Sequence, residues 1–469
     1  MWKKRDPAFA SEMQWMFLQN NRYAEPGIGG GYPAMSGFRG LMTDTNIVPK
    51  APAWGSELFP ETGAVLRNKY PSDRETYLHM IAGNNHAHYD MDSGSVTFWG
   101  KGRILADDFG YYGYAPAEDH NLVLSPVAGN GGIMRIEEFQ TSPTADYVRG
   151  KSAGWTREAL LVKDADPSAP NYAVLADTLG APAPATWQLW CTAAKVTPNA
   201  AGAAVEGRED VNMDIFFASP NSPSFKTEEK TRRSGSGLHT NWSWGPMEST
   251  QIGLLATVER GKGFLAVLYP RLKTEAAPAF KAVADGKGVQ IRHAAGVDYV
   301  FAGREPIKFK DENVDFEGTV GVAQLRGAKP ALFLGAGGRI TAGGQTLTSD
   351  KPAAAAGGNL FEGGDFESEG RRLAMAAPYQ DADITVYEGN PVETSPHEGR
   401  HCLSMKMKGN RGFVGAAQGL YVDATKMYRV KASYVCPTNV VVSVGGYGSD
   451  GKNTNLPDPK GNVWQWSLA

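Results

Sequence analysis

The chain has 469 residues and a formal net charge of −3 at neutral pH, from 47 lysines and arginines against 50 aspartates and glutamates. Its length leaves room for two or three domains with a substantial core. The charge balance excludes the basic surface that nucleic-acid binding needs, and no apolar run reaches the roughly 18 residues of a membrane-spanning helix.

Residues 1–62 begin with a helical pattern and continue into glycine- and proline-rich loops. Four side chains form a broad apolar stripe on the predicted helix: Met13, Trp15, Met16 and Phe17. The charged N-terminus has no apolar stretch behind it, so it does not have the pattern of a signal peptide.

Residues 63–348 are dense in strand signals. Short apolar alternations recur, for example at residues 257–260, 264–269 and 288–291. The chain's 56 glycines and 29 prolines supply many turns between such segments. These features predict an all-β body in which helices are a minor part.

The most informative part of this body is residues 84–121, which the pattern predicts to be two strands joined by a turn at residues 100–102. Four polar side chains alternate along the first strand and project from one face: His86, His88, Asp90 and Asp92. Such groups are costly to bury together unless a metal ion or a substrate satisfies them. The segment therefore predicts a binding site.

A zinc site is one interpretation of this segment. Imidazole and carboxylate groups are the usual ligands of a catalytic Zn²⁺ ion, which keeps one position open for water or substrate. His88 on the first strand, Asp108 after the second and His120 beyond a short loop supply such a set. Their spacing is not a compact zinc motif, and a hydrogen-bonded network of surface histidines at a sheet edge fits the same residues.

Other side chains have ordinary structural interpretations. Arg135 and Arg157 are able to bind a substrate carboxylate, but exposed arginines are common on strands, so neither is assigned to the site. His79 and His293 sit within strand patterns, and we expect them to be structural.

The end of the chain differs in composition from the body. Residues 349–358 are low in complexity and predict a linker. The tail, residues 359–469, opens with a segment that resembles the start of jelly-roll carbohydrate-binding modules, and we expect a truncated module of this kind. Asp365 and Glu367 in its opening are candidate ligands of a structural Ca²⁺ ion.

The motifs of the central segment, taken together, resemble those of the heparinase II/III-like polysaccharide lyases, a family that includes heparin, heparan and oligoalginate lyases. The matching stretches are residues 86–90, 94–96, 102–110 and 120–121. Similar stretches extend the resemblance on both sides: residues 63–67, 157–161, 174–177, 298–301 and 317–321.

This resemblance implies a mainly β fold with a large antiparallel β-sandwich at residues 63–348. Residues 1–62 would be the end of an α/α toroid. The linker at residues 349–358 and the truncated jelly roll at residues 359–469 rest on the separate features of the tail given above. The implied activity is cleavage of uronic-acid-containing glycans by β-elimination, in the periplasm, outside the cell or at its surface. Partner groups from a full toroid have no counterpart in this chain, so its unaided activity stays open.

The resemblance also implies roles for single residues. His88, Asp108 and His120 would bind zinc, and His86 would be the catalytic group beside it. Asp108 is preferred over its neighbour Asp107 because it stands two residues before a glycine, as in the family pattern.

One departure from the family pattern leaves two registers open, because Met91, Asp92 and Ser93 separate Asp90 from the Gly-Ser pair. Either the strand bulges after Asp90, which we prefer, or Asp90 and Asp92 take the places of the second histidine and the aspartate. A rival function also remains: a noncatalytic carbohydrate-binding or cell-surface sandwich in which the same residues hold a structural metal.

Overall fold

The computed structural model describes residues 2–19, 46–59, 62–83, 90–109, 115–129, 132–234 and 247–349, and short strands after residue 373. By its internal contacts the chain divides into two compact units, Met1–Gly358 and Asn359–Ala469. No helix of the described residues is long and apolar enough to cross a membrane.

The predicted N-terminal helix is confirmed. It consists of α1 (Trp2–Arg5) and α2 (Pro7–Gln19), and α2 begins with a proline whose missing N–H costs nothing at that position. The carboxylate of Asp6 accepts a hydrogen bond from the backbone N–H of Phe9 at 3.0 Å and so caps the helix. Trp15 meets the ring of Tyr70 edge-on, whereas Met13 is 42% exposed.

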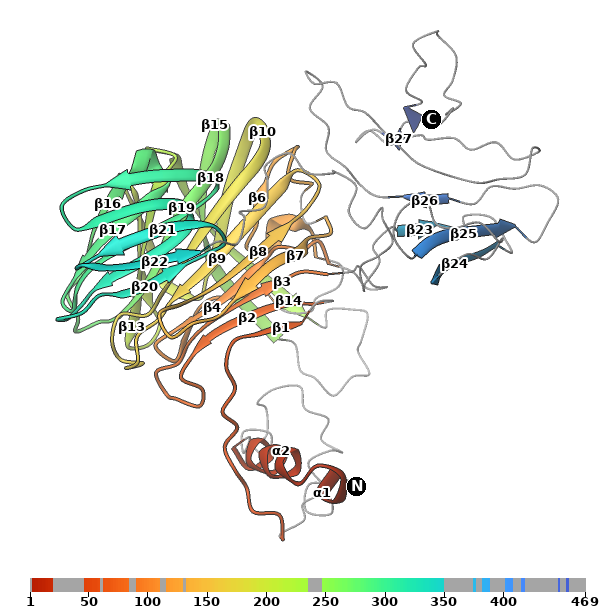
Figure 1. The fold of residues 1–469 in the computed structure, drawn as a ribbon, viewed down its shortest axis with the longest axis horizontal. Helices are drawn as coiled ribbons and strands as arrows, with labels where there is room; N and C mark the ends of the chain where they lie inside the picture. The colour runs from red at the N-terminus through yellow and green to blue at the C-terminus, as the bar shows by residue number, and fades with distance from the viewer. Residues whose placement is uncertain are drawn as a thin grey trace. The chain divides into compact units, whose positions relative to one another are not determined.

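The body of the first unit is two antiparallel sheets (Figure 1). The first sheet contains β1 (Glu57–Phe59), β2 (Gly63–Asn68), β3 (Thr76–Ile81), β4 (Val96–Gly100), β5 (Arg103–Ala106), β6 (Val123–Leu124), β7 (Arg135–Gln140), β8 (Ala145–Lys151), β9 (Trp155–Val162), β10 (Tyr172–Cys191), β11 (Ala193–Asn199), β12 (Gly202–Gly207), β13 (Val211–Ser219), β14 (Ser224–Ser234) and β15 (Met247–Leu272). The second contains β16 (Ala279–Val283), β17 (Gly288–His293), β18 (Gly296–Lys310), β19 (Val314–Leu325), β20 (Ala331–Leu334), β21 (Gly338–Ala342) and β22 (Gln345–Ser349). One 3₁₀ turn, η2 (Ala117–Asp119), lies between β5 and β6 in the chain, and another, η3 (Ala284–Gly286), lies between β16 and β17. The prediction of a mainly β, antiparallel fold is confirmed.

One hydrophobic core joins the two sheets. Val174 on β10 and Val267 on β15 are fully buried, together with Val289, Val300 and Val322 of the second sheet. Burial of alternate side chains on facing sheets is the expected result of the two-residue period of the strands. The long strands β10 and β15 pair along most of their length. They extend from this core to the end of β10, where Trp190 pairs with Gly253.

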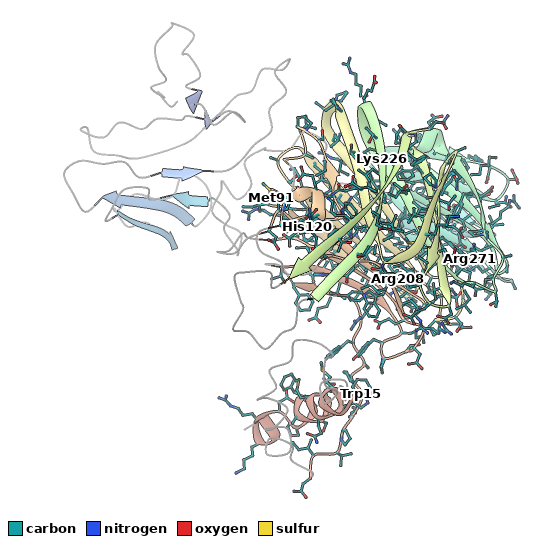
Figure 2. The ribbon with its side chains drawn as sticks, turned by 180° about the vertical axis from the view of Figure 1, so that it is seen from behind. Trp15, Met91, His120, Arg208, Lys226 and Arg271 are labelled. Carbon is teal, nitrogen blue, oxygen red and sulfur yellow. The ribbon has the colours of Figure 1, made fainter. Side chains whose placement is uncertain are left out.

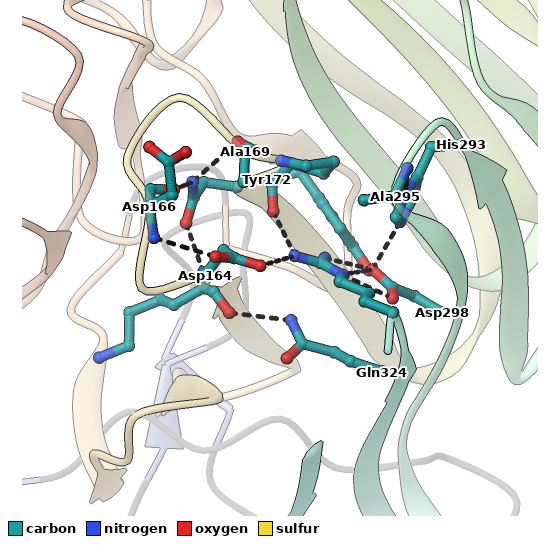
Figure 3. Close-up of polar contacts among 12 residues, drawn as sticks. Asp164, Asp166, Ala169, Tyr172, His293, Ala295, Asp298 and Gln324 are labelled. Carbon is teal, nitrogen blue, oxygen red and sulfur yellow. Dashed lines mark hydrogen bonds and ion pairs between the residues drawn. The ribbon is translucent and has the colours of Figure 1, made fainter. Parts of the chain in front are cut away.

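A buried polar network also ties the sheets together (Figure 3). Arg326 donates from Nε to the carboxylate of Asp298 at 2.9 Å, and Tyr172 donates from its hydroxyl to the same carboxylate at 2.8 Å. Nε2 of His293 lies 3.1 Å from it, which confirms the structural assignment of this histidine. Burial raises the pKa of Asp298, but the hydrogen bonds from Arg326 and His293 outweigh it and hold the pKa below its usual value.

In the second unit the described strands are β23 (Ala374–Ala376), β24 (Ala382–Glu388), β25 (His401–Met407), β26 (Gly415–Ala417), β27 (Gly446–Tyr447) and β28 (Asn453–Thr454). They form the antiparallel pairs β23–β26, β24–β25 and β27–β28. Asp365 and Glu367, the predicted calcium ligands, lie outside the described residues. The jelly roll and its calcium site therefore stay predictions.

Candidate functional site

The predicted hairpin of the central segment is present. β4 and β5 pair antiparallel, and Lys101 and Gly102 form the turn between them with φ angles of 50° and 79°. Positive φ costs little at glycine, which fits the break in the apolar pattern at this point. After β5 the chain leads directly to Asp107 and Asp108.

The structure brings Asp108 and His120 together. Oδ2 of Asp108 lies 2.8 Å from Nδ1 of His120, and the histidine side chain is only 1% exposed (labelled in Figure 2). The other ring nitrogen, Nε2, is buried and has no hydrogen-bond partner among the described residues. A proton shared between Nδ1 and the carboxylate leaves the Nε2 lone pair available for a metal ion or for a proton.

Asp107, the competitor for Asp108, has different surroundings. Burial raises the pKa of Tyr77 on β3, and the charge of Asp107 adds to this rise. Burial also raises the pKa of Asp107 itself to about 6. Of the two adjacent aspartates, Asp108 is therefore the one in contact with His120.

The residue after His120 fixes the local backbone. Asn121 accepts a hydrogen bond from the backbone N–H of Trp190 at 2.6 Å and donates from Nδ2 to the carbonyl of Val96 at 2.8 Å. Its own backbone N–H donates to the hydroxyl of Ser95 at 3.0 Å. The Gly-Ser and His-Asn pairs of the sequence motif are thus joined directly, and they tie the loop to β4 and β10.

Arg157 lies beneath the same loop, and the expectation that it is an exposed strand arginine is wrong. Its side chain is 1% exposed and forms an ion pair with the buried carboxylate of Asp177 at 2.8 Å. The guanidinium also donates to the carbonyls of Gly94 at 2.9 Å and Asn121 at 2.7 Å. Arg157 therefore holds the backbone of both motif segments and is not available to a substrate.

The predicted period-two strand does not continue through Asp90 and Asp92. Residues 90–95 form a turn, in which the N–H of Ser95 donates to the carbonyl of Asp92 at 2.7 Å. Gly94 has a φ of 93°, and a Cβ there would lie 2.6 Å from the ring of Trp155. A side chain is excluded at that position, which explains the glycine in the motif.

Two glutamines hold the site from the long strands, and sequence analysis missed both. Gln188 on β10 donates to the carbonyl of Ala117 at 2.8 Å and also to the carbonyl of His120. Gln251 on β15 donates to the carbonyl of Asp108 at 2.8 Å. The partners are far apart in the chain, so no local sequence pattern marks them.

A charged cluster anchors η2 to β14. Asp119, whose side chain is 1% exposed, accepts hydrogen bonds from Lys230 at 2.8 Å and from Nε of Arg232 at 2.7 Å. The ammonium of Lys230 also stands 4.5 Å from the ring centre of Trp190. This cluster secures the residue immediately before His120.

Carboxylates surround the histidine. Burial lowers the pKa of His120, but the hydrogen bond and charge of Asp108, with the charges of Asp92 and Asp90, outweigh it and raise the pKa. Burial raises the pKa of Asp92. The charge of His120 lowers this pKa, and the charge of Asp90 raises it further. Such an environment stabilises a cation.

The remaining predicted residues, His86 and His88, lie outside the described residues. The choice between the two registers therefore stays a prediction. Within the part of the chain that the structure describes, no group of three histidine, cysteine or acidic side chains is arranged to hold a metal ion. Two of the three predicted zinc donors, Asp108 and His120, are described and adjacent.

No family profile matches the chain, and neither does any curated protein. Among solved structures it is similar to the heparan sulfate lyase HepC from Pedobacter heparinus, with 13% identity and a TM-score of 0.43, over 63% of this chain and 48% of that one. It is also similar to a heparinase III, with 11% identity and a TM-score of 0.40, over 61% of this chain and 43% of that one. The chain thus spans less than half the length of each.

Proposed function

We propose that this chain belongs to a polysaccharide lyase that cleaves uronic-acid-containing glycans by β-elimination. The observation that carries the proposal is the buried His120, held by Asp108 at Nδ1 and without a described partner at Nε2. An unpaired buried imidazole nitrogen is costly unless a ligand or a proton transfer uses it. The residues around it resemble the motifs of the heparinase II/III-like lyases.

The donor chemistry fits zinc. In the proposal His88 and His120 would supply imidazole ligands, His120 through Nε2, while Asp108 would hold His120 from Nδ1 as the outer carboxylate. Imidazole ligands suit zinc better than a harder cation. The negative charges of Asp90, Asp92 and Asp108 around the histidine would repel an acidic glycan. An acidic glycan would therefore need a cation at this site. A zinc ion held by these residues would supply positive charge at a site whose own side chains are acidic.

The residues of the chain have separate tasks in the reaction. Elimination requires removal of the weakly acidic proton on the carbon next to the carboxylate, and then departure of the glycosidic oxygen. His86 is proposed to move a proton at this centre, beside the metal. Asp108 keeps the ring of His120 oriented, while Gln188 and Arg157 keep the backbone of the loop in place. The proposed location is the periplasm, the cell surface or the medium, where such polymers occur.

A rival remains, in which a noncatalytic carbohydrate-binding sandwich holds a structural metal at the same residues. The test is ultraviolet absorbance of the unsaturated uronate that elimination creates. Zinc-loaded chain is incubated with heparin, heparan sulfate and alginate. We expect the signal on at least one polymer and its loss in His86→Ala, whose zinc content should be normal. No signal on any uronate polymer would favour the rival.

A further inference from the structure

A polar groove lies on the outer face of the first sheet, across the edge formed by β11, β12, β13 and β15. It encloses about 320 Å³. Its lining includes Lys195, Thr197, Ala204, Asn212, Arg271 and Lys273. Figure 2 shows Arg271 well apart from His120, so this groove is separate from the candidate site described above.

The strand register explains the shape of the groove. Thr197 on β11 stands opposite Ala204 on β12, and Asn212 on β13 stands opposite Arg271 on β15. The methyl group of Ala204 leaves a depression between longer neighbours. From β11 to β15 the groove crosses three strand spacings of about 4.8 Å, or about 14 Å, with a lysine at each side.

The charges of the groove are mostly positive and partly unpaired. Nε of Arg271 donates to Asp214 at 2.6 Å, so this cation is already neutralised. Lys195 and Lys273 form no ion pair with any described residue, and Glu206 is the one acidic side chain among the lining residues. The groove therefore carries excess positive charge on a chain whose net charge is −3.

We propose that this groove is an accessory binding site for an acidic glycan chain, with Lys195 and Lys273 pairing its carboxylate or sulfate groups. The inference rests on the substrate class proposed above. It adds a second contact that keeps a long polymer attached while another part of it occupies the candidate site.

The polar groups between the lysines suit sugar hydroxyls. Oδ1 of Asn212 accepts a hydrogen bond from the N–H of Gly207 at 3.2 Å, and its amide nitrogen has no partner among the described residues. Thr197 offers a hydroxyl, and Glu206 offers an acceptor. A groove with donors and acceptors between two cations matches a polymer that carries both hydroxyls and negative charges.

The test compares glycan binding by two double variants with equal changes in charge. Lys195→Ala/Lys273→Ala removes the groove lysines. Lys308→Ala/Lys310→Ala is the control, because both lysines are 77% exposed on the second sheet and are paired with Glu317 and Asp315. Dissociation constants for heparin, alginate and neutral dextran are measured by calorimetry on zinc-free protein, so that no cleavage occurs.

We expect the groove variant to bind heparin or alginate roughly tenfold more weakly than wild type, from two modest charge contacts. The dissociation constant of the control variant should stay within about twofold of the wild-type value, and none of the proteins should bind dextran. Equal losses in both double variants would overturn the proposal, because they would indicate unspecific charge attraction. Wild-type affinity in the groove variant would overturn it as well.

A second variant tests shape without changing charge. Ala204→Phe fills the depression at an exposed strand position where an aromatic residue is well tolerated. It should weaken binding as much as the lysine variant does, and unchanged affinity would exclude a glycan from the groove. If wild type cleaves a uronate polymer but these variants bind it as tightly as wild type does, only the groove proposal is excluded. If the variants bind more weakly but no cleavage is seen, only the proposed lyase function is excluded.

Discussion

Oδ2 of Asp108 lies 2.8 Å from Nδ1 of His120, and this contact joins the end of β5 to the loop that follows η2. A carboxylate at Nδ1 fixes the orientation and tautomer of an imidazole and raises its strength as a donor at Nε2. The contact therefore prepares one nitrogen of a buried histidine for a metal ion.

Asp108→Asn should lower the zinc affinity of the chain by roughly 10- to 100-fold, because the histidine loses its charged partner. Affinity is measured by competition with a chromophoric chelator. Asp107→Asn is the matched control, since no hydrogen bond joins its carboxylate to the histidine among the described residues, and its charge instead helps to raise the pKa of Tyr77. Equal losses in the two variants would contradict the assignment of Asp108.

The two neighbouring histidines should separate in their effects. His88→Ala should lower bound zinc and the melting temperature together, since metal binding to the folded state is itself folding free energy. His86→Ala should leave both unchanged and affect only turnover. Elemental analysis and thermal unfolding check this, and loss of zinc in His86→Ala would exchange the two roles.

The local parts of the site were predictable from the sequence. The β4–β5 hairpin followed from apolar alternation around Lys101 and Gly102, and Asp108 with His120 followed from residue type and motif. Asp90 and Asp92 were placed on a strand because alternation alone suggested one. The turn at Gly94 overrides that pattern, since its backbone needs a positive φ and leaves no room for a side chain.

Long-range support was not predictable in this way. Gln188 and Gln251 contact the site across 68 and 143 positions of the chain, and nothing in their neighbourhood marks them. Arg157 was expected to be exposed because alternation assigns a face to a side chain but does not show whether another layer covers that face. Only the packing of the loop over β9 buries it.

Arg157→Met should destabilise the fold by about 3–5 kcal/mol, because it leaves the buried carboxylate of Asp177 without its partner. Urea unfolding measures the loss. Lys308→Met, which breaks an exposed pair with Glu317, should leave the midpoint unchanged. A midpoint for Arg157→Met close to that of wild type would show that the ion pair does not support the loop.

Glu158 should make stability depend on pH. It is fully buried, the hydroxyl of Tyr147 donates to Oε1 at 2.7 Å, and Oε2 has no described partner. Burial raises the pKa of Glu158 from 4.5 to about 7. The folded state therefore holds this proton more tightly than the unfolded state, so the contribution to stability is full below pH 4.5 and is lost as the pH rises through 7.

Glu158→Gln removes this dependence, because an amide does not ionise. The variant should exceed wild type in stability by up to about 3 kcal/mol at pH 8, and the difference should shrink as the pH falls toward 4.5. Urea unfolding across this range checks it. Glu317→Gln, at an exposed position, is the control, and parallel pH profiles for wild type and Glu158→Gln would refute the argument.

The most direct test of the account is the mass of the oligosaccharides that the zinc-loaded chain releases from a uronate polymer in water labelled with heavy oxygen. Elimination splits the chain without adding water, so we predict that each cut gives one fragment with an unsaturated end and one with an ordinary reducing end, neither with an added water, and no products from His120→Ala. Products that have gained a labelled water would show hydrolysis and contradict the central claim.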